Sequence, residues 1–261
     1  MKLNQYTHIY LLGIGGIGMS ALARYFLAHN KIVAGYDLTP SPLTLELEKE
    51  GAQIHFTDDI KLVDIEFLNT DITLVIYTPA IPLGHNELNF FKENDYPLLK
   101  RSQVLGLISR DKFCIAIAGT HGKTTVSSMV AHIFNLGING CNAFLGGIAS
   151  NYNSNLILNE NSNNLVVEAD EFDRSFLQLS PNLAIITSMD ADHLDIYDDH
   201  KGLQASFQEF IDRIQSNGKL LIKSGLEKNI KTELQVYTYS ITHSKADFYI
   251  ENLQLLNGIY H

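Results

Sequence analysis

The stretch FCIAIAGTHGKTT, residues 113–125, decides the fold of the second half of this chain. Residues 113–118 are a continuous apolar run, which is typical of a buried parallel strand, and residues 123–136 have the apolar spacing of a helix. A strand, a glycine loop and a helix in this order predict a phosphate-binding loop. Lys123 would reach the β- and γ-oxygens of a nucleotide, and Thr124 would offer its hydroxyl to magnesium. The predicted nucleotide-binding residues are Gly119, Thr120, His121, Gly122, Lys123, Thr124 and Thr125.

This loop is shorter than the general P-loop pattern. The pattern has a glycine five residues before Gly122, and Ile117 stands at that position. A Gly-Lys-Thr sequence can also arise by chance on a surface helix. The apolar strand before the loop and the helix after it favour the phosphate site over this alternative.

Acidic side chains follow two later apolar runs, at the point where each predicted strand ends. Glu168, Asp170 and Glu171 come directly after residues 165–167. After residues 183–186 come Asp190, Asp192 and His193. Because the carboxyl ends of parallel strands meet at one edge of a sheet, we expect these groups to lie near Lys123. Carboxylates and an imidazole there predict magnesium binding against a triphosphate, the alternative being that they are only solvated.

A second glycine loop, GIGGIG at residues 13–18, lies near the start of the chain. It has the G-x-G-x-x-G spacing, follows the apolar run 8–12 and opens a segment with helical spacing at 17–29. Asp37 ends the next apolar run, where an acidic residue of a Rossmann fold meets a ribose hydroxyl. The pattern predicts binding of a nucleotide diphosphate, for which NAD is the default ligand, and the alternative is a glycine turn that only packs tightly.

Strand-like and helix-like segments alternate along the chain, which predicts α/β architecture with parallel sheets. The strands expected first are 8–12, 31–36, 53–56, 73–77 and 97–99, with helices at 17–29, 43–50 and 86–94. The second series has strands at 113–118, 165–167, 183–186 and 219–223, with helices at 123–136 and 200–214. The Asn-rich segment 151–164 is expected to be a surface loop. We place one domain at 1–106 and the next at 107–261, which 261 residues readily accommodate.

Composition narrows the classes of partner. With 19 basic and 29 acidic residues the formal charge is −10, which disfavours nucleic acid as a partner. Cys114 and Cys141 stand in apolar runs and are expected to be buried and reduced. The apolar segment 9–23 is interrupted by four glycines, and no stretch is long enough to span a bilayer. We therefore expect a cytoplasmic protein without a membrane partner.

Two nucleotide-type loops about a hundred residues apart are unusual for a dehydrogenase. They resemble the Mur ligases, in which one domain holds a UDP-sugar and the next holds ATP. The resemblance covers essentially the whole chain. It rests on GIGGIGMSALA, GYD, YTPAIP, KRSQVLGLI, AGTHGKTT, VVEADEFDRSF and ITSMDADHLDIY. The short ATP loop is this family's own variant.

The resemblance implies a ligase of peptidoglycan precursor synthesis. GIGGIGMSALA and ADHLDIY are most similar to the branch that adds L-alanine to UDP-N-acetylmuramate; the alternative within the family is the recycling branch that adds a whole tripeptide. In the implied reaction the lactyl carboxylate attacks the γ-phosphate of ATP to give an acyl phosphate. The amine of L-alanine then displaces phosphate, with Mg²⁺ offsetting the repulsion between anions.

The resemblance also implies residue roles. Lys123, Glu168 and His193 would be the catalytic residues, with Thr124 and Glu168 on a first magnesium and His193 on a second. The residues expected to line the UDP-sugar site are Gly13, Gly15, Gly16, Gly18 and Asp37. His121, Asp173 and Arg174 are further candidates for substrate contact, and no general base is evident.

One departure from the family concerns the end of the chain. Family members carry a third, Rossmann-like domain that binds the amino acid, and residues 236–261 show strands and turns with no helix that closes a domain. We therefore expect this chain alone to bind the UDP-sugar but to turn over poorly.

Three other classes remain open from the sequence. An NAD-dependent oxidoreductase would explain residues 13–18 and Asp37 but not residues 119–125. A non-catalytic nucleotide sensor would keep both loops without ligation, and a phosphotransferase acting on a small molecule would need only the second domain. Binding of NAD(H) tests the first, and loss of turnover in a Lys123→Ala variant of a full-length protein separates the second from a ligase.

Overall fold

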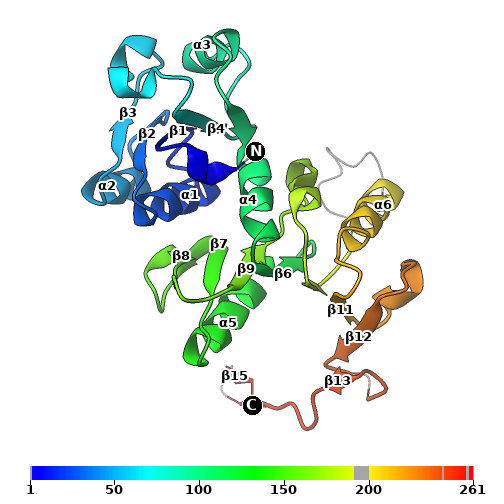
Figure 1. The fold of residues 1–261 in the computed structure, drawn as a ribbon. Helices are drawn as coiled ribbons and strands as arrows, with labels where there is room; N and C mark the ends of the chain where they lie inside the picture. Colours follow the sequence, from blue (N-terminus) through cyan, green and yellow to red (C-terminus); the bar gives the residue numbers. More distant parts are fainter. Residues whose placement is uncertain (1, 191–199, 243, 257–258, 261) are drawn as a thin grey trace.

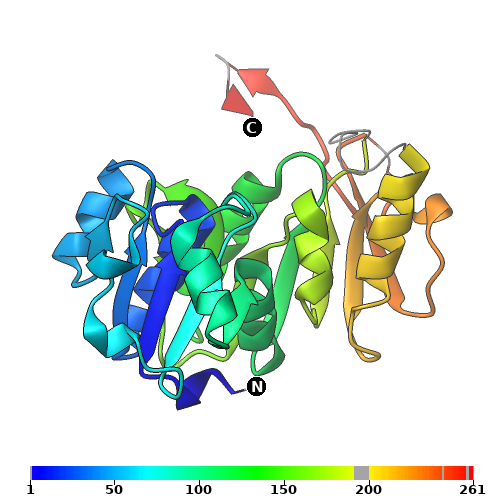
Figure 2. The same cartoon turned by 90° about the horizontal axis from the view of Figure 1, so that it is seen from above.

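The computed structural model describes residues 2–190, 200–242, 244–256 and 259–260. Two β-sheets lie side by side, each covered by helices, and the chain completes the first before it begins the second (Figure 1). Seen from above, the first sheet with its helices and the later strands with helix α6 occupy opposite sides of the molecule (Figure 2). The α/β architecture predicted from the alternation of segments is confirmed.

The first sheet has the strand order β3-β2-β1-β4-β5, and all its pairings are parallel. Its strands are β1 (His8–Leu12), β2 (Ile32–Tyr36), β3 (Gln53–His55), β4 (Thr73–Tyr77) and β5 (Leu98–Lys100). Its helices are α1 (Ile17–Ala28), α2 (Pro42–Lys49) and α3 (Asn86–Glu93), with short 3₁₀ turns at Leu3–Gln5, Ile60–Leu62 and Ile65–Phe67. The central strand β1 is buried along its whole length, as its uninterrupted apolar sequence predicts.

The two helices beside the first glycine loop begin in different ways. Helix α2 has a side-chain cap: the Ser41 hydroxyl accepts from the Thr44 N–H, Thr44 reaches back to Ser41, and Pro42 is the first helical residue. Helix α1 begins after Gly16 with no side chain that caps it. The N–H groups of its first turn are therefore left for another acceptor.

The second sheet has the order β13-β12-β11-β10-β6-β9-β7-β8, and only the β7–β8 pair is antiparallel. Its first strands are β6 (Phe113–Ala118), β7 (Asn142–Ala149), β8 (Ser154–Ile157) and β9 (Asn164–Glu168). The later ones are β10 (Leu183–Ile186), β11 (Lys219–Lys223), β12 (Gln235–Ser240) and β13 (Phe248–Tyr249). Helices α5 (Lys123–Leu136) and α6 (His200–Ile211) and the 3₁₀ segments Phe172–Gln178 and Leu226–Asn229 accompany them, and β14 (Leu255–Leu256) pairs with β15 (Ile259–Tyr260).

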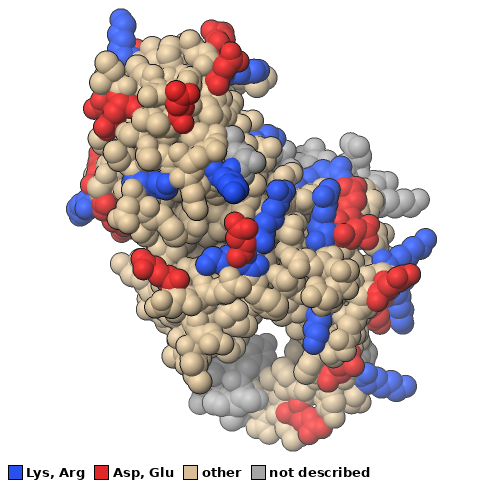
Figure 3. Space-filling view, in the orientation of Figure 1, with Lys and Arg blue, Asp and Glu red and all other residues tan. Residues whose placement is uncertain are grey.

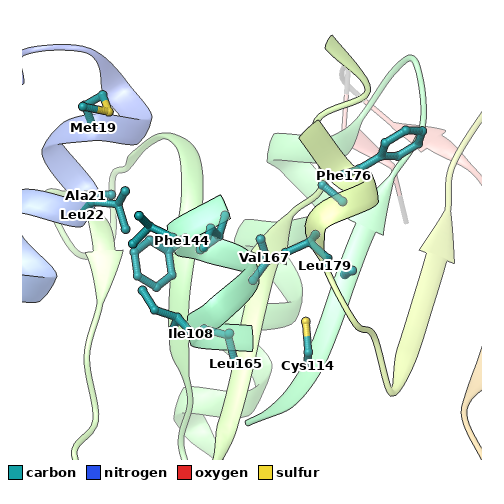
Figure 4. Packing of buried hydrophobic residues seen from close by; sticks show 14 of the residues in the cluster. Met19, Ala21, Leu22, Ile108, Cys114, Phe144, Leu165, Val167, Phe176 and Leu179 are labelled. Atoms are coloured by element: carbon teal, nitrogen blue, oxygen red, sulfur yellow. The ribbon is translucent and has the colours of Figure 1, made fainter. Parts of the chain in front are cut away.

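Helix α4 (Arg101–Arg110) joins the two sheets and packs between them (Figure 1). One hydrophobic core runs through this junction, from Leu22 of α1 through Ile108 of α4 to Phe176 beyond β9 (Figure 4). Gly106 permits the close packing, because a Cβ there would overlap the carbonyl of Gln178. The predicted boundary between residues 106 and 107 falls inside α4 and stays a prediction.

The expectation of a surface loop over residues 151–164 is wrong. Residues 154–157 form strand β8, which pairs with β7, a strand that the sequence analysis did not predict. Gly146 and Gly147 interrupt the apolar pattern of β7, and the polar Asn155 interrupts that of β8. The helix expected over 200–214 ends at Ile211, and Ile214 is buried in the turn that follows. Both cysteines are buried and free.

Within the described residues, every helix is too short or too polar to cross a membrane.

Candidate functional site

The first glycine loop, residues 13–18, connects β1 to α1 and is closely packed. Gly13 has φ +85°, and a Cβ there would lie 2.7 Å from Thr78 Cγ2. The Gly15 N–H donates to Asp37 Oδ2 at 2.7 Å, so the acidic residue at the end of β2 meets the loop directly. A Cβ on Gly15 would lie 2.9 Å from the same oxygen. The loop and Asp37, predicted to share one site, are brought together.

Arg101 is a residue of this site that the sequence analysis missed. It is the first residue of α4, and a Cβ on Gly18 would come within 2.8 Å of its Nη1. Its guanidinium therefore lies over the first turn of α1, and none of the described carboxylates forms an ion pair with it. The signal was present in the quoted KRSQVLGLI stretch, but nothing in the sequence places residue 101 beside residue 18.

A cavity of about 710 Å³ extends from this loop toward the second sheet. The first sheet with its helices, up to the start of α4, is called the first unit below, and the second sheet with its helices the second unit. The first unit contributes the following lining residues, among others: Gly13, Gly15, Gly16, Gly18, Tyr36, Asp37, Thr78, His85 and Arg101. From the second sheet, Phe144, Gly146, Glu168 and Asp170 line the same cavity. The predicted UDP-sugar residues and one predicted metal ligand therefore border one continuous space.

The second glycine loop, residues 119–122, connects β6 to α5. Gly119 has φ +135° and Gly122 has φ +80°, conformations that favour glycine. The hydroxyls that follow β10 hold the loop: Ser188 Oγ accepts from the His121 N–H at 2.9 Å, and Thr187 Oγ1 donates to the His121 carbonyl at 2.5 Å. The ends of β6 and β10 thus meet here, as expected for neighbouring parallel strands.

Lys123 is held between two acceptors. Its Nζ donates to the Gly119 carbonyl at 2.8 Å and lies 2.8 Å from Glu171 Oε2. The Glu171 side chain is fully buried, whereas the Lys123 side chain is 13% exposed, so the cation is the accessible member of the pair. The sequence analysis placed Glu171 in the acidic cluster after residues 165–167, where it was expected near Lys123, but it did not predict the ion pair between the two side chains.

Thr124 and Glu168 form the part of the predicted magnesium site that the structure describes. Thr124 Oγ1 and Glu168 Oε1 are 3.1 Å apart, and the Gly146 N–H holds the other carboxylate oxygen at 3.0 Å. Neighbouring ligands of an octahedral Mg²⁺ at 2.0–2.1 Å are about 3 Å apart, so this hydroxyl and carboxylate fit the ion. His193, the third predicted ligand, lies outside the described residues. No cluster of three or more His, Cys, Asp or Glu side chains is found among the residues that are described.

The further candidates for substrate contact are spread apart. The His121 side chain is exposed. Arg174 forms an ion pair with Glu209 of α6 at 2.5 Å and does not line the cavity. The side chain of Asp173 lies outside the described part of the structure. Thr125 is exposed in the first turn of α5.

A buried polar network stands behind the cavity wall in the first unit. Glu87 is 0% exposed and accepts a hydrogen bond from the Tyr10 hydroxyl at 2.7 Å. That hydroxyl is also 2.8 Å from His55 Nε2. Burial raises the pKa of Glu87 to about 7 and lowers the pKa of His55.

The charged side chains do not form a large surface of one sign on the face that Figure 3 shows. Basic and acidic side chains are interspersed over the face seen in Figure 3, and the chain as a whole carries −10. Attraction of an anion therefore depends on single features: the first turn of α1 with Arg101, and the second loop with Lys123.

Comparison with known proteins decides the family. The family pattern described as "Mur ligase family, catalytic domain" matches residues 8–113, and "Mur ligase middle domain" matches residues 117–259. The chain belongs to the Mur ligase family. This confirms the resemblance that was drawn from the two loops and the motifs around them.

Curated relatives agree with this membership. Over 262 aligned positions this Mur ligase chain is 51% identical to the UDP-N-acetylmuramate–L-alanine ligase of Parabacteroides distasonis, an alignment that covers 99% of this chain and 56% of the relative. The corresponding Flavobacterium psychrophilum ligase is 50% identical, with 100% and 56% covered. The chain spans about half the length of the curated relatives it matches.

A solved structure of a Mur ligase has the same fold. The UDP-N-acetylmuramate–alanine ligase of Thermotoga maritima aligns with a TM-score of 0.77 at 26% identity, covering 90% of this chain and 53% of that one. The two-sheet arrangement is thus the architecture of the family, and the α/β prediction with two nucleotide-type loops is confirmed at the level of the fold.

Proposed function

We propose that this chain provides the UDP-sugar and ATP sites of a ligase that joins L-alanine to the lactyl carboxylate of UDP-N-acetylmuramate. The observation that carries the proposal is the cavity of about 710 Å³, which is lined by the first glycine loop at one end and by Glu168 at the other. A substrate with a diphosphate at one end and a reactive carboxylate at the other matches such a space. The 51% identity to a relative named for this reaction supports the amino acid.

The first end of the cavity suits a nucleotide diphosphate. The uncapped first turn of α1 presents N–H donors, and the Arg101 guanidinium lies beside Gly18. Asp37 accepts from the Gly15 N–H and stands where a ribose hydroxyl would reach it. Both phosphate charges and the sugar hydroxyls thus have partners from this chain.

The second end suits phosphoryl transfer from ATP. Residues 119–125 would hold the phosphates, with the Lys123 ammonium on the β- and γ-oxygens in place of Glu171. Thr124 and Glu168 would hold Mg²⁺, with His193 as the proposed further ligand. The ion would neutralise charge on the triphosphate and on the incoming carboxylate.

The proposed reaction has two steps. A lactyl carboxylate oxygen attacks the γ-phosphorus, the bond to the β-phosphate oxygen breaks, and ADP leaves. The amine of L-alanine then attacks the carbonyl carbon of the acyl phosphate, loses a proton and expels inorganic phosphate. The chain's own contribution is to place two anions together and to offset their repulsion with Lys123.

One detail of the proposal, the amino acid, follows the relatives rather than the site. L-alanine is preferred to a tripeptide because the relatives at about half identity are named for alanine. The cytoplasm as the place of action, and the division of the chain at residues 106 and 107, are proposed with it.

Calorimetric titration of this chain with UDP-N-acetylmuramate, and with NADH as the control ligand, tests the proposal. Heat from the UDP-sugar alone is expected. Binding of NADH without binding of the UDP-sugar would reject the proposal and favour an oxidoreductase. A separate titration with ATP and Mg²⁺ examines the second loop, and Lys123→Ala in a full-length protein distinguishes a ligase, which loses turnover, from a sensor.

A further inference from the structure

An asparagine in β8 connects the second sheet to the helix that carries the first glycine loop. Asn155 stands between Ser154 and Leu156 in the strand and is 0% exposed. Its Nδ2 donates to the Ile17 carbonyl at 2.5 Å and to Ser20 Oγ at 2.8 Å. Both acceptors belong to the first turn of α1, whose residues line the cavity.

The acceptor oxygen of the same amide is also engaged. Arg24 Nη1 donates to Asn155 Oδ1 at 2.6 Å. The Arg24 side chain is 9% exposed, and its other nitrogens form ion pairs with Glu46 of α2 at 2.7 Å and with Glu50, which follows α2, at 3.0 Å. Only an amide offers donors to α1 and an acceptor to Arg24 from one side chain. A buried amide satisfied on both ends, between two units, is a specific contact rather than incidental packing.

Strand β8 is also connected, through β7, to the residues at the other end of the cavity. Leu156, next to Asn155, is paired with Phe144 of β7. Two residues further along β7, the Gly146 N–H holds Glu168, the proposed magnesium ligand. The path from the first turn of α1 to Glu168 therefore consists of one side-chain amide, the pairing of Leu156 with Phe144, and the irregular part of β7 between Phe144 and Ala149 that contains Gly146.

We propose that Asn155 is a positioning residue, which fixes the first turn of α1 against β7 and β8. It thereby sets the distance between the diphosphate end of the cavity and the Glu168 end. This inference rests on the proposed function for its catalytic meaning, since a fixed distance matters when one substrate spans both ends. Reacting groups must lie within about 3–3.5 Å of each other, so a small displacement of α1 would reduce productive encounters.

Two space-filling replacements separate this role from simple stability. Asn155→Asp keeps the size and the acceptor for Arg24 but removes both donors to α1. Asn155→Leu also keeps the size and removes donor and acceptor alike. The matched control is Asn161→Asp, because Asn161 is exposed in the same Asn-rich segment.

The test is a distance between the two units, measured by pulsed electron paramagnetic resonance on the whole chain without ligand. Spin labels at Ile65→Cys and Ile138→Cys report it, because these residues are 83% and 105% exposed. The native Cys114 and Cys141 are both 0% exposed and do not compete for the label. Thermal unfolding of each variant is recorded alongside.

In Asn155→Asp and Asn155→Leu we expect the distance distribution to broaden at least twofold, with Asn161→Asp unchanged. Lower thermal stability with an unchanged distribution would assign Asn155 to stability alone and overturn the proposal. The measurement needs no nucleotide, so its result is independent of whether the chain binds UDP-N-acetylmuramate. If the unlabelled wild type failed to bind that ligand, the proposed function would fail while the distance result still stood.

Discussion

The two glycine loops share one local design and differ in where their charge comes from. Each follows a buried strand and opens a helix, yet the first loop has no charged side chain of its own and receives Asp37 and Arg101 from other elements. The second contains Lys123 within the loop-to-helix turn and holds it on Glu171. A loop that uses backbone donors is suited to retain a diphosphate, whereas a loop with a side-chain cation is suited to stabilise the charge of a phosphoryl group that is transferred.

Removal of the cation from the second loop is expected to have the largest effect. Lys123→Met should weaken ATP binding about 300-fold, because a charged donor aimed at phosphate is lost. UDP-N-acetylmuramate should bind within about twofold of wild type, since the first loop is built separately. Calorimetry of this chain with each ligand measures both values. An equal loss at the two sites would contradict the independence of the loops.

The converse change is Gly15→Ala in the first loop. The new methyl group would lie 2.7 Å from Thr44 Cγ2 and 2.9 Å from Asp37 Oδ2, so the loop or α2 must shift. We expect about a 50-fold loss of UDP-N-acetylmuramate affinity, which corresponds to the cost of an overpacked site, and unchanged ATP binding. Gly84→Ala is the control, because the space around Gly84 is open. Normal UDP-sugar affinity in Gly15→Ala would place the ligand elsewhere.

Two buried carboxylates also differ in their partners. Glu171 forms an ion pair with Lys123, whereas Glu87 contacts Tyr10 and His55. Burial raises the Glu87 pKa from 4.5 to about 7, so the folded protein binds more protons than the unfolded chain between these values. Stability should therefore fall as pH rises from about 4.5 to 7, by about 2 kcal/mol. Glu87→Gln should remove this slope and be more stable than wild type at pH 8, as measured by urea unfolding. A slope retained in the variant would point to another group.

The smallest effect is expected from the removal of Arg101, the cation that α4 places beside the first loop. Arg101→Gln should weaken UDP-N-acetylmuramate binding about tenfold, the contribution of one charged hydrogen bond, and should reduce the dependence of binding on salt. Arg110→Gln, at the exposed far end of the same helix, is the control. An affinity that stays at the wild-type value would mean that Arg101 does not contact the diphosphate, and the first loop would then rely on backbone donors alone.

Much of the fold follows from local sequence. Strands β1, β4, β6 and β10 have the bounds that their apolar runs predict, because a strand buried on both faces is apolar along its length. Strand β8 could not be found in this way. Its Asn155 is polar because its partners are on α1, more than 130 residues earlier in the chain.

The same distinction applies to the site. The glycine spacing within each loop predicts the residues whose backbone N–H groups would bind phosphate, because this spacing is a local property of the sequence. Arg101 and Glu171 depend on contacts that only the tertiary structure makes. Arg101 lies over Gly18 through the placement of α4, and Glu171 meets Lys123 across the ends of β6 and β9. The sequence can suggest such charged residues as candidates, but it does not show which of the two loops each of them contacts.

The continuous core through α4 has a consequence for how such chains can be recombined. Because Leu22, Ile108 and Phe176 belong to one hydrophobic cluster, the two units share an interior rather than a surface. Exchange of the first hundred residues between two members of the family would join half of one core to half of another. Such a hybrid would need matched residues along α4 before either nucleotide loop was altered, and the two units of the natural chain should unfold in a single cooperative transition.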